Sequence, residues 1–289
     1  MAIPFLWPHL KWCWSCKRGC PFALGNDAMS SSGPSDYSTF DGIIDCRSQA
    51  AFVQGHLPGS LWLPWPQLRQ LQNALPPPGA RLLLIEAPTA AVQWLKQQGY
   101  AVMSHRWSAV THSPMQTGLK QGMLFQPSPP LMAMLDQWPR RGRALDMGCG
   151  GGRDAVYLAR QGWLVNGVDR AQRALDKARA LARLYGVCVD WRCCNLRADN
   201  CLPTGQFDLI LMMRFLLPER FEWMQRHLRP GGRVIVWAFH EEAARPARAQ
   251  CKTTPEKLMR GFDRLTTITA TIASLPDGRP MSLYIGEKA

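Results

Sequence analysis

Long apolar runs are absent from this 289-residue chain, and no stretch approaches the roughly 18 residues that a bilayer-spanning helix needs. We expect no secretory signal in the first segment either, because the charged residues Lys11, Lys17 and Arg18 follow the first apolar stretch instead of preceding it. The composition, 46% hydrophobic and 19% charged, is typical of a soluble globular protein. We therefore expect no membrane-spanning segment.

Acidic residues are few relative to basic ones: 21 Asp and Glu against 34 Lys and Arg give a net charge of +13. A basic surface attracts nucleic acid, anionic lipid or small oxyanions. Arginines are spread over the second half of the chain, without the dense basic and aromatic runs of a dedicated RNA-binding tail. A solvated basic face is the favoured interpretation, and RNA stays an open alternative as a partner.

The ten cysteines are scattered along a chain far larger than the small domains that disulfides stabilise. We therefore expect reduced thiols and a cytoplasmic location. Cys13, Cys16 and Cys20 have a spacing that metal ligands can have, but a fourth ligand is missing nearby. We expect no metal site.

Two stretches rich in Pro, Ser or Gly divide the chain, at residues 30–38 and 111–130. Met29 directly precedes the first stretch, which suggests that translation naturally begins there. No internal repeat is visible. The predicted parts are an N-terminal extension (1–38), a first domain (39–110), a linker with a lead-in helix (111–139) and a second domain (140–289).

The first domain has a short strand ending in Asp45-Cys46-Arg47, a helix over residues 49–54, a Gly-His-Leu-Pro-Gly turn and a strand over residues 61–63. This order resembles the rhodanese family over roughly residues 40–108. In that family, the next strand ends in a catalytic cysteine whose loop holds a persulfide.

Here the next strand, residues 82–85, is followed by Glu86 and a shortened loop, and the helix expected over residues 92–98 comes after it. Without a thiolate at that place, sulfur transfer is not expected. Cys46 and His56 stand at framework positions of the resemblance, so we assign them structural roles. The resemblance thus implies an inactive rhodanese-like module that stabilises the protein or docks a protein partner.

The second domain opens with a short apolar strand that enters a glycine-rich turn, Asp146-Met-Gly-Cys-Gly-Gly-Gly152, followed by a helix over residues 155–161. The glycines let the backbone approach a ligand closely. A second strand ends in Asp169, about twenty residues downstream, where a carboxylate can accept hydrogen bonds from ribose hydroxyls. A dinucleotide site would share both of these features.

The pattern D-x-G-C-G-x-G resembles motif I of the class I S-adenosylmethionine (SAM) dependent methyltransferases. The resemblance implies SAM as the cofactor: the glycines contact its methionine moiety, Asp146 positions its ammonium through the loop, and Asp169 binds the ribose. Asn195-Leu196 stands where that family usually has Asp-Leu against the adenine. The predicted cofactor-binding residues are Asp146, Gly148, Cys149, Gly150, Gly152, Asp169, Arg170, Asn195, Leu196 and Met212.

The remaining elements follow in the order of that fold. A helix is expected over residues 171–185, strands over 188–192, 207–212 and 234–239, and a closing hairpin over 266–273 and 281–285. Leu228-Arg-Pro-Gly-Gly232 resembles the turn before the family's fifth strand. The expected fold class is α/β: a Rossmann-like, seven-stranded class I methyltransferase domain preceded by a smaller α/β rhodanese-like domain.

The glycine-loop region most resembles the tellurite-resistance group of small methyltransferases, which favours a small-molecule, metalloid or oxyanion acceptor. Acceptor-side groups come from the carboxyl ends of the fourth and fifth strands, where Arg214 could hold an oxyanion and His240 could remove a proton. Their alternatives are a surface arginine and a capping histidine. Two other functions remain open: an RNA methyltransferase that uses the basic surface, and a SAM-binding scaffold that docks a partner.

Overall fold

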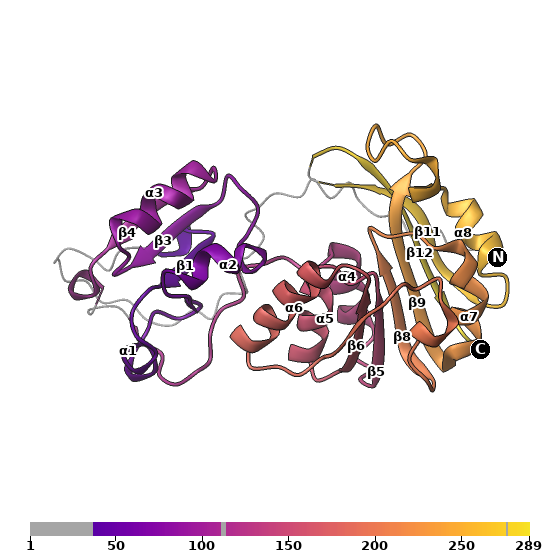
Figure 1. Ribbon diagram of the computed structural model, residues 1–289, viewed down its shortest axis with the longest axis horizontal. Helices are drawn as coiled ribbons and strands as arrows, with labels where there is room; N and C mark the ends of the chain where they lie inside the picture. The colour runs from indigo at the N-terminus through magenta and orange to yellow at the C-terminus, as the bar shows by residue number, and fades with distance from the viewer. Residues whose placement is uncertain (1–36, 111–113, 276) are drawn as a thin grey trace, which may run out of the picture.

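The computed structural model describes residues 37–110, 114–275 and 277–289 (Figure 1). The predicted extension, with Met29 and the three cysteines at 13, 16 and 20, therefore lies outside the described residues. The described chain folds into two sheets that follow one another along the sequence. No helix in these three ranges is long and apolar enough to cross a membrane.

The first sheet has four parallel strands in the order β2-β1-β3-β4. Its central strand β3 is buried from Leu82 onward, as expected of a strand with neighbours on both sides. The elements are β1 (Gly42–Asp45), α1 (Gln49–Gln54), β2 (Leu61–Trp62), α2 (Gln67–Gln70), the 3-10 turn η2 (Gln72–Ala74), β3 (Arg81–Ile85), α3 (Thr89–Gln97) and β4 (Ala101–His105). The helix predicted at residues 49–54 is confirmed as α1, and the one predicted at 92–98 begins earlier, directly after Pro88.

The second sheet has the order β11-β12-β9-β8-β5-β6-β7, with β12 antiparallel to both of its neighbours. Its strands are β5 (Arg143–Met147), β6 (Leu164–Asp169), β7 (Asp190–Cys193), β8 (Phe207–Met213), β9 (Leu228–His240), β10 (Lys252–Thr253), β11 (Thr266–Ser274) and β12 (Pro280–Glu287). Its helices are α4 (Pro129–Gln137), α5 (Arg153–Arg160), α6 (Gln172–Leu184), α7 (Phe221–His227) and α8 (Pro255–Gly261).

Three details of this sheet differ from the prediction. The sheet has eight strands instead of seven, because the two-residue β10 pairs with the end of β9. The third strand begins at Asp190, two residues later than expected. The glycine-containing turn predicted at residues 228–232 lies inside β9, where Gly231 has a φ of +68° and the pairing with β8 shifts register.

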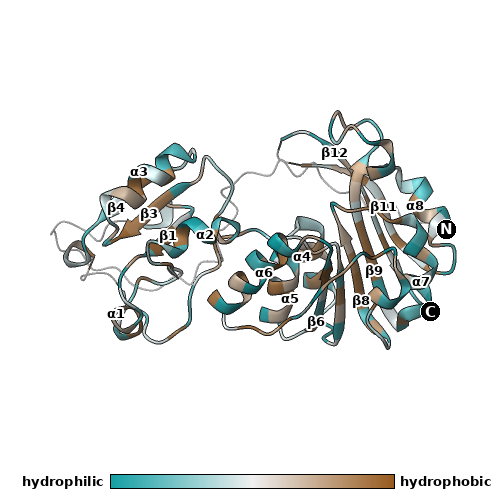
Figure 2. Cartoon of the chain, viewed as in Figure 1, coloured by the Kyte–Doolittle hydropathy of each residue, from teal (hydrophilic) through white to brown (hydrophobic). Residues whose placement is uncertain are grey.

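Different helices pack on the two faces of the second sheet. Side chains of β8 alternate between them: Leu209, Leu211 and Met213 join the core under α4, α5 and α6, whereas Ile210 and Met212 join the core under α7 and α8. Figure 1 shows α4, α5 and α6 on the side of the sheet that faces the first domain. In Figure 2 the strands are hydrophobic and the outward helix faces hydrophilic, which is the pattern of a three-layer α/β domain.

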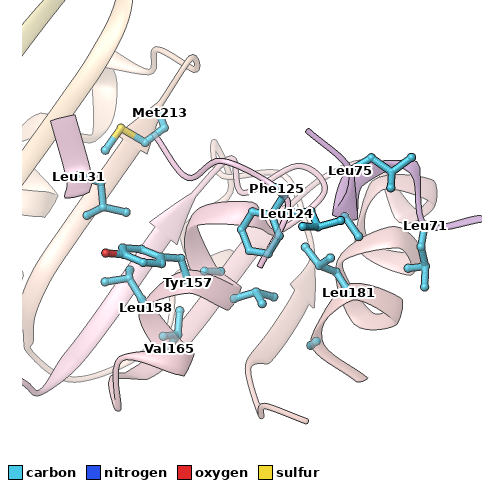
Figure 3. Close-up of a cluster of buried hydrophobic side chains, with 14 of the residues drawn as sticks. Leu71, Leu75, Leu124, Phe125, Leu131, Tyr157, Leu158, Val165, Leu181 and Met213 are labelled. Atoms are coloured by element: carbon cyan, nitrogen blue, oxygen red, sulfur yellow. The ribbon is translucent and has the colours of Figure 1, made fainter. Parts of the chain in front are cut away.

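The core under α5 and α6 continues into the first domain (Figure 3). Leu71 and Leu75, from the first domain, belong to the same buried cluster as Leu124 of the linker and Leu181 of α6. Shared apolar burial of this kind stabilises the contact between two domains. The first domain is thus packed against the helices that follow the glycine-rich turn.

Candidate functional site

The glycine loop, residues 148–152, connects the carboxyl end of β5 to the first turn of α5. Gly148, Gly150 and Gly152 all have left-handed backbones, with φ values of +76°, +52° and +76°. The amides of Gly148 and Cys149 donate to the Val168 carbonyl at 2.8 and 3.1 Å, which attaches the loop to the end of β6. L-residues with side chains rarely adopt such φ values, so this loop needs glycine for its shape.

The three left-handed glycines differ in how much space a Cβ atom would have. A Cβ atom on Gly152 would lie 2.7 Å from both Ala178 Cβ and Trp191 Cη2, so this glycine permits close packing of α5, α6 and β7. A Cβ on Gly148 would lie 2.6 Å from Phe215 Cγ. A Cβ on Gly150 would meet nothing within 4 Å. The open space of the loop is therefore at Gly150, with the Phe215 ring lying over Gly148.

Asp169, the last residue of β6, ties the loop to the next helix. Its Oδ2 accepts from the Gly150 amide at 2.9 Å, and its Oδ1 accepts from the Ala171 amide at 2.8 Å. A carboxylate offers about four acceptor positions, so two amide bonds leave capacity for a diol. The side chain stands beside the open space at Gly150, where ribose hydroxyls could reach it.

Two further acids lie buried beside the loop. Asp146 is 2% exposed, and its pKa is raised well above the usual range, chiefly by burial and then by the nearby carboxylates of Asp154 and Asp169. Burial also raises the pKa of Asp154, although the amide and hydroxyl of Ser128 donate to it at 2.6 and 2.7 Å. Three carboxylates around one loop favour a ligand that carries positive charge, such as a sulfonium or an ammonium.

The predicted adenine-side residues have different environments. Asn195 is exposed, and its Oδ1 accepts from the Arg197 amide at 3.1 Å. Leu196 is buried in the core, and its carbonyl accepts from Arg220 Nε at 2.6 Å. Arg170 is exposed directly after Asp169. Among these three residues, only Asn195 and Arg170 present side chains at the surface.

Met212 was expected at the cofactor, but its side chain is fully buried in the core under α7 and α8. Its Sδ accepts a hydrogen bond from the Leu217 amide at 3.3 Å. Because β8 is buried along both faces, the sequence alone does not reveal which of its residues face a ligand. The side chain of Met212 stabilises the turn after β8 instead.

Cys194 and Cys201 form a disulfide, with their Cα atoms 5.6 Å apart. The expectation of reduced thiols throughout was therefore wrong for this pair. Closure of a short loop brought the two cysteines together, and a spacing of seven residues carries no distinctive sequence signal. The bond brackets Asn195 and Leu196, so it restrains the segment that follows β7. Cys46, Cys149, Cys188, Cys193 and Cys251 are free thiols.

The two acceptor-side candidates differ in character. Arg214 is exposed just after the carboxyl end of β8, with a φ of +53° and its amide donating to the Trp237 carbonyl at 2.7 Å. Burial lowers the pKa of Arg153 and the charge of Arg214 lowers it further, whereas at Asp154 the same charge opposes the rise in pKa that burial causes. A left-handed non-glycine residue at a strand end is typical of functional sites.

His240 ends β9 and is only 7% exposed. Its Nδ1 accepts from the Glu242 amide at 3.2 Å, so this ring nitrogen organises the turn that follows the strand. This contact matches the alternative of a capping histidine.

In the first domain, Cys46 and His56 have the surroundings of structural residues and not of a nucleophilic pair. Burial, reinforced by Asp45, raises the pKa of Cys46 to about 12, so its thiol stays protonated at neutral pH. His56 is fully buried, with Nδ1 2.8 Å from the Phe52 carbonyl and Nε2 3.0 Å from the Lys120 carbonyl. Glu86 has a φ of +51° and its Oε1 accepts from the Trp107 amide at 2.7 Å.

Sequence reasoning missed three residues around the loop: Asp154, Trp191 and Asn73. Asp154 had a visible signal, since an acid in the first turn of a helix after a glycine loop is well placed for a buried charge. Asn73 had none, because it lies 78 residues from the loop that it contacts.

Comparison with known proteins agrees with the geometry. Residues 144–232 match the methyltransferase domain family. An uncharacterized protein of Schizosaccharomyces pombe, UNK4.09, is 23% identical over 85% of this chain and 93% of its own length. A ubiquinone biosynthesis O-methyltransferase of Chromobacterium violaceum is 31% identical over 37% of this chain. The match covers 47% of that enzyme, so the chain spans about half of its length.

Among solved structures, TehB from Haemophilus influenzae superposes with a TM-score of 0.50 at 16% identity, covering 56% of this chain and 63% of its own. At that identity the likeness concerns the fold alone. Residues 144–232 thus match a methyltransferase domain, which indicates SAM as the cofactor, and the second domain has a Rossmann-like α/β fold that is similar to that of TehB.

Proposed function

We propose that the whole protein is a methyltransferase that acts on a small acceptor carrying an anionic or oxyanion group, including metalloid oxyanions. The observation that carries the proposal is the glycine loop with open space at Gly150, flanked by the carboxylates of Asp146, Asp154 and Asp169. Such an arrangement suits a cationic ligand with ribose hydroxyls. The likeness of the loop to that of the tellurite-resistance group supports the same acceptor class.

In this proposal, each residue of the loop region has a defined task. Asp169 accepts hydrogen bonds from the ribose hydroxyls while its two amide partners hold the carboxylate in place. Asp146, through the loop, stabilises the cofactor's ammonium. Gly148 lets the Phe215 ring pack directly on the loop, beside the open space at Gly150 where the methionine moiety is proposed to lie. Asn195, with Cys149 and Arg170, completes the nucleoside side.

The acceptor is proposed to lie at the carboxyl end of β8, held by Arg214. Guanidinium groups bind carboxylates and oxyanions through two parallel hydrogen bonds, and Arg153 adds positive charge nearby. When bound, SAM supplies an electrophilic methyl group on its sulfonium. The protein's contribution is then alignment of the acceptor atom with that methyl group, which requires little acid–base help if the acceptor arrives as an anion. His240 is therefore given no proton-transfer step.

The names of the relatives favour a small acceptor over RNA. The ubiquinone biosynthesis O-methyltransferases are named for a small-molecule reaction, and two of them match 37% and 35% of this chain. The net charge of +13 keeps RNA as the alternative acceptor. RNA binding would weaken steeply with rising salt, whereas binding of a small acceptor would depend on salt weakly.

The first domain, residues 39–110, is proposed to be a rhodanese-like module without sulfurtransferase activity. Glu86 stands at the place of the nucleophile, and Cys46 is held protonated. Its part would be to stabilise the second domain and to dock a protein partner. A cytoplasmic location and the remaining predicted boundaries, 1–38, 111–139 and 140–289, stay predictions.

Transfer of label from radioactive SAM tests the proposal. Purified protein would be incubated separately with a small-metabolite pool, with metalloid oxyanions and with total RNA. We expect labelled product in one of the first two pools, lost in Arg214→Ala. Label in the RNA pool alone would favour the RNA alternative, and SAM binding with no transfer to any pool would favour the scaffold alternative.

A further inference from the structure

Asn73 of the first domain contacts the glycine loop directly. It lies in η2, and its Nδ2 donates to the Gly151 carbonyl at 3.0 Å and to the Lys177 carbonyl of α6 at 3.3 Å. The backbone carbonyl of the same residue accepts from Arg153 Nε at 2.9 Å. One residue of the first domain thus holds the loop, the start of α5 and the middle of α6.

The surroundings of Asn73 fix its orientation. Leu71 and Leu75, on either side of η2, are buried in the core shared with the second domain (Figure 3). The Leu75 carbonyl accepts from Arg153 as well, at 3.3 Å. Two carbonyls face the Asn73 amide nitrogen, so its Oδ1 points away, and it is buried without a hydrogen-bond partner among the described residues. The two donor bonds thus hold the Asn73 side chain in an orientation that leaves a buried acceptor unpaired, which costs free energy.

The Gly151 carbonyl, which accepts from Asn73, belongs to the part of the loop that borders the open space at Gly150. Gly151 directly follows Gly150, whose amide donates to Asp169. The next amide, that of Gly152, donates back to the Cys149 carbonyl at 2.9 Å and closes the turn. The Gly151 carbonyl and the Gly152 amide belong to one peptide unit, so the bond from Asn73 and the turn bond restrain the same peptide plane, one residue after Gly150. Movement of that plane would shift the Gly150 amide and the Asp169 carboxylate together.

We propose that Asn73 is a positioning residue for cofactor binding, so that the first domain completes the cofactor site of the second. The inference rests on the proposed cofactor site at Gly150 and Asp169. The Schizosaccharomyces pombe relative supports it, since its similarity covers 85% of this chain, more than the second domain alone. A partner that moved the first domain would, through Asn73, change the affinity for SAM.

The test uses the full chain with Asn73→Ala and Asn73→Asp, and with Gln72→Ala, an exposed neighbour in the same turn, as the control. The affinity for S-adenosylhomocysteine is measured by titration calorimetry. Loss of a hydrogen bond lowers affinity by about 5-fold, so we expect Asn73→Ala to bind about 5-fold more weakly. Asn73→Asp keeps the size but places an acceptor against two carbonyls, so its loss should be at least as large. Gln72→Ala should bind as the wild type does.

Hydrogen exchange separates positioning from general destabilisation. In Asn73→Ala, the peptide covering residues 148–153 should exchange faster while β8 and β9 keep wild-type protection. Unchanged affinity and unchanged exchange in both Asn73 variants would overturn the inference alone. Uniformly faster exchange over the whole second domain would also overturn it, since the role would then be structural. A wild-type protein that binds no S-adenosylhomocysteine would contradict the proposed site itself.

Discussion

Replacing Gly152 by alanine should strongly destabilise the second domain. The backbone there has a φ of +76°, and an L-residue in that conformation costs about 1–2 kcal/mol. The new Cβ would also lie 2.7 Å from Ala178 Cβ and Trp191 Cη2, and overpacking of this kind costs about 1–3 kcal/mol. The sum predicts a loss of about 2–5 kcal/mol in the free energy of unfolding.

The neighbouring glycine supplies the control. Gly151 lies outside the left-handed region, and a Cβ there would come no closer than 3.5 Å to Asn73 Nδ2. Gly151→Ala should therefore change the free energy of unfolding by no more than about 1 kcal/mol. Urea unfolding followed by tryptophan fluorescence and circular dichroism measures both variants. A Gly152→Ala protein within 1 kcal/mol of the wild type, or a Gly151→Ala protein that is equally destabilised, would refute the packing argument.

Three further predictions concern charge and reactivity. Burial, reinforced by two nearby carboxylates, raises the pKa of Asp146, so the ligand-free protein loses stability as the pH rises through that pKa. At pH 8, Asp146→Asn should therefore have a higher melting temperature than the wild type and should bind SAM more weakly. Equal melting temperatures would contradict this. Arg214→Gly should relieve the left-handed backbone strain and so stabilise the protein by about 1–2 kcal/mol. It should also raise the KM for the acceptor and leave the affinity for S-adenosylhomocysteine unchanged. A less stable Arg214→Gly protein would contradict the strain argument. Iodoacetamide at pH 8 should label the exposed Cys188 but not Cys46, whose pKa is about 12. Rapid labelling of Cys46, detected by mass spectrometry, would contradict this raised pKa.

Local pattern was enough to predict the loop that forms the candidate site. The strand, glycine turn and helix around Gly148 are contiguous in sequence, and Asp169 follows at the end of the next strand. The closing hairpin was predicted correctly as well, because two strands flank a Pro-Asp-Gly turn signal. The structure confirms these elements with small shifts at their ends.

Contacts between distant residues could not be predicted from local pattern. The disulfide depends on how residues 194–201 close around Leu196, and no periodicity reports that closure. Met212 lies in a strand that is buried on both faces, so its orientation follows from the strand order of the whole sheet. The contact of Asn73 with Gly151 depends on the packing of two domains. Each is a tertiary effect with no signature in the neighbouring residues.

Titration of S-adenosylhomocysteine into the wild-type protein and Asp169→Ala tests the central claim, that the glycine loop and Asp169 bind SAM. The control is Asp176→Asn, an exposed carboxylate on α6. Hydrogen bonds to a charged group contribute about 1.5–3 kcal/mol, so Asp169→Ala should bind roughly 10- to 150-fold more weakly. The wild type and Asp176→Asn should bind one equivalent with equal affinity. No binding by the wild type, or equal affinity in Asp169→Ala, would contradict the account.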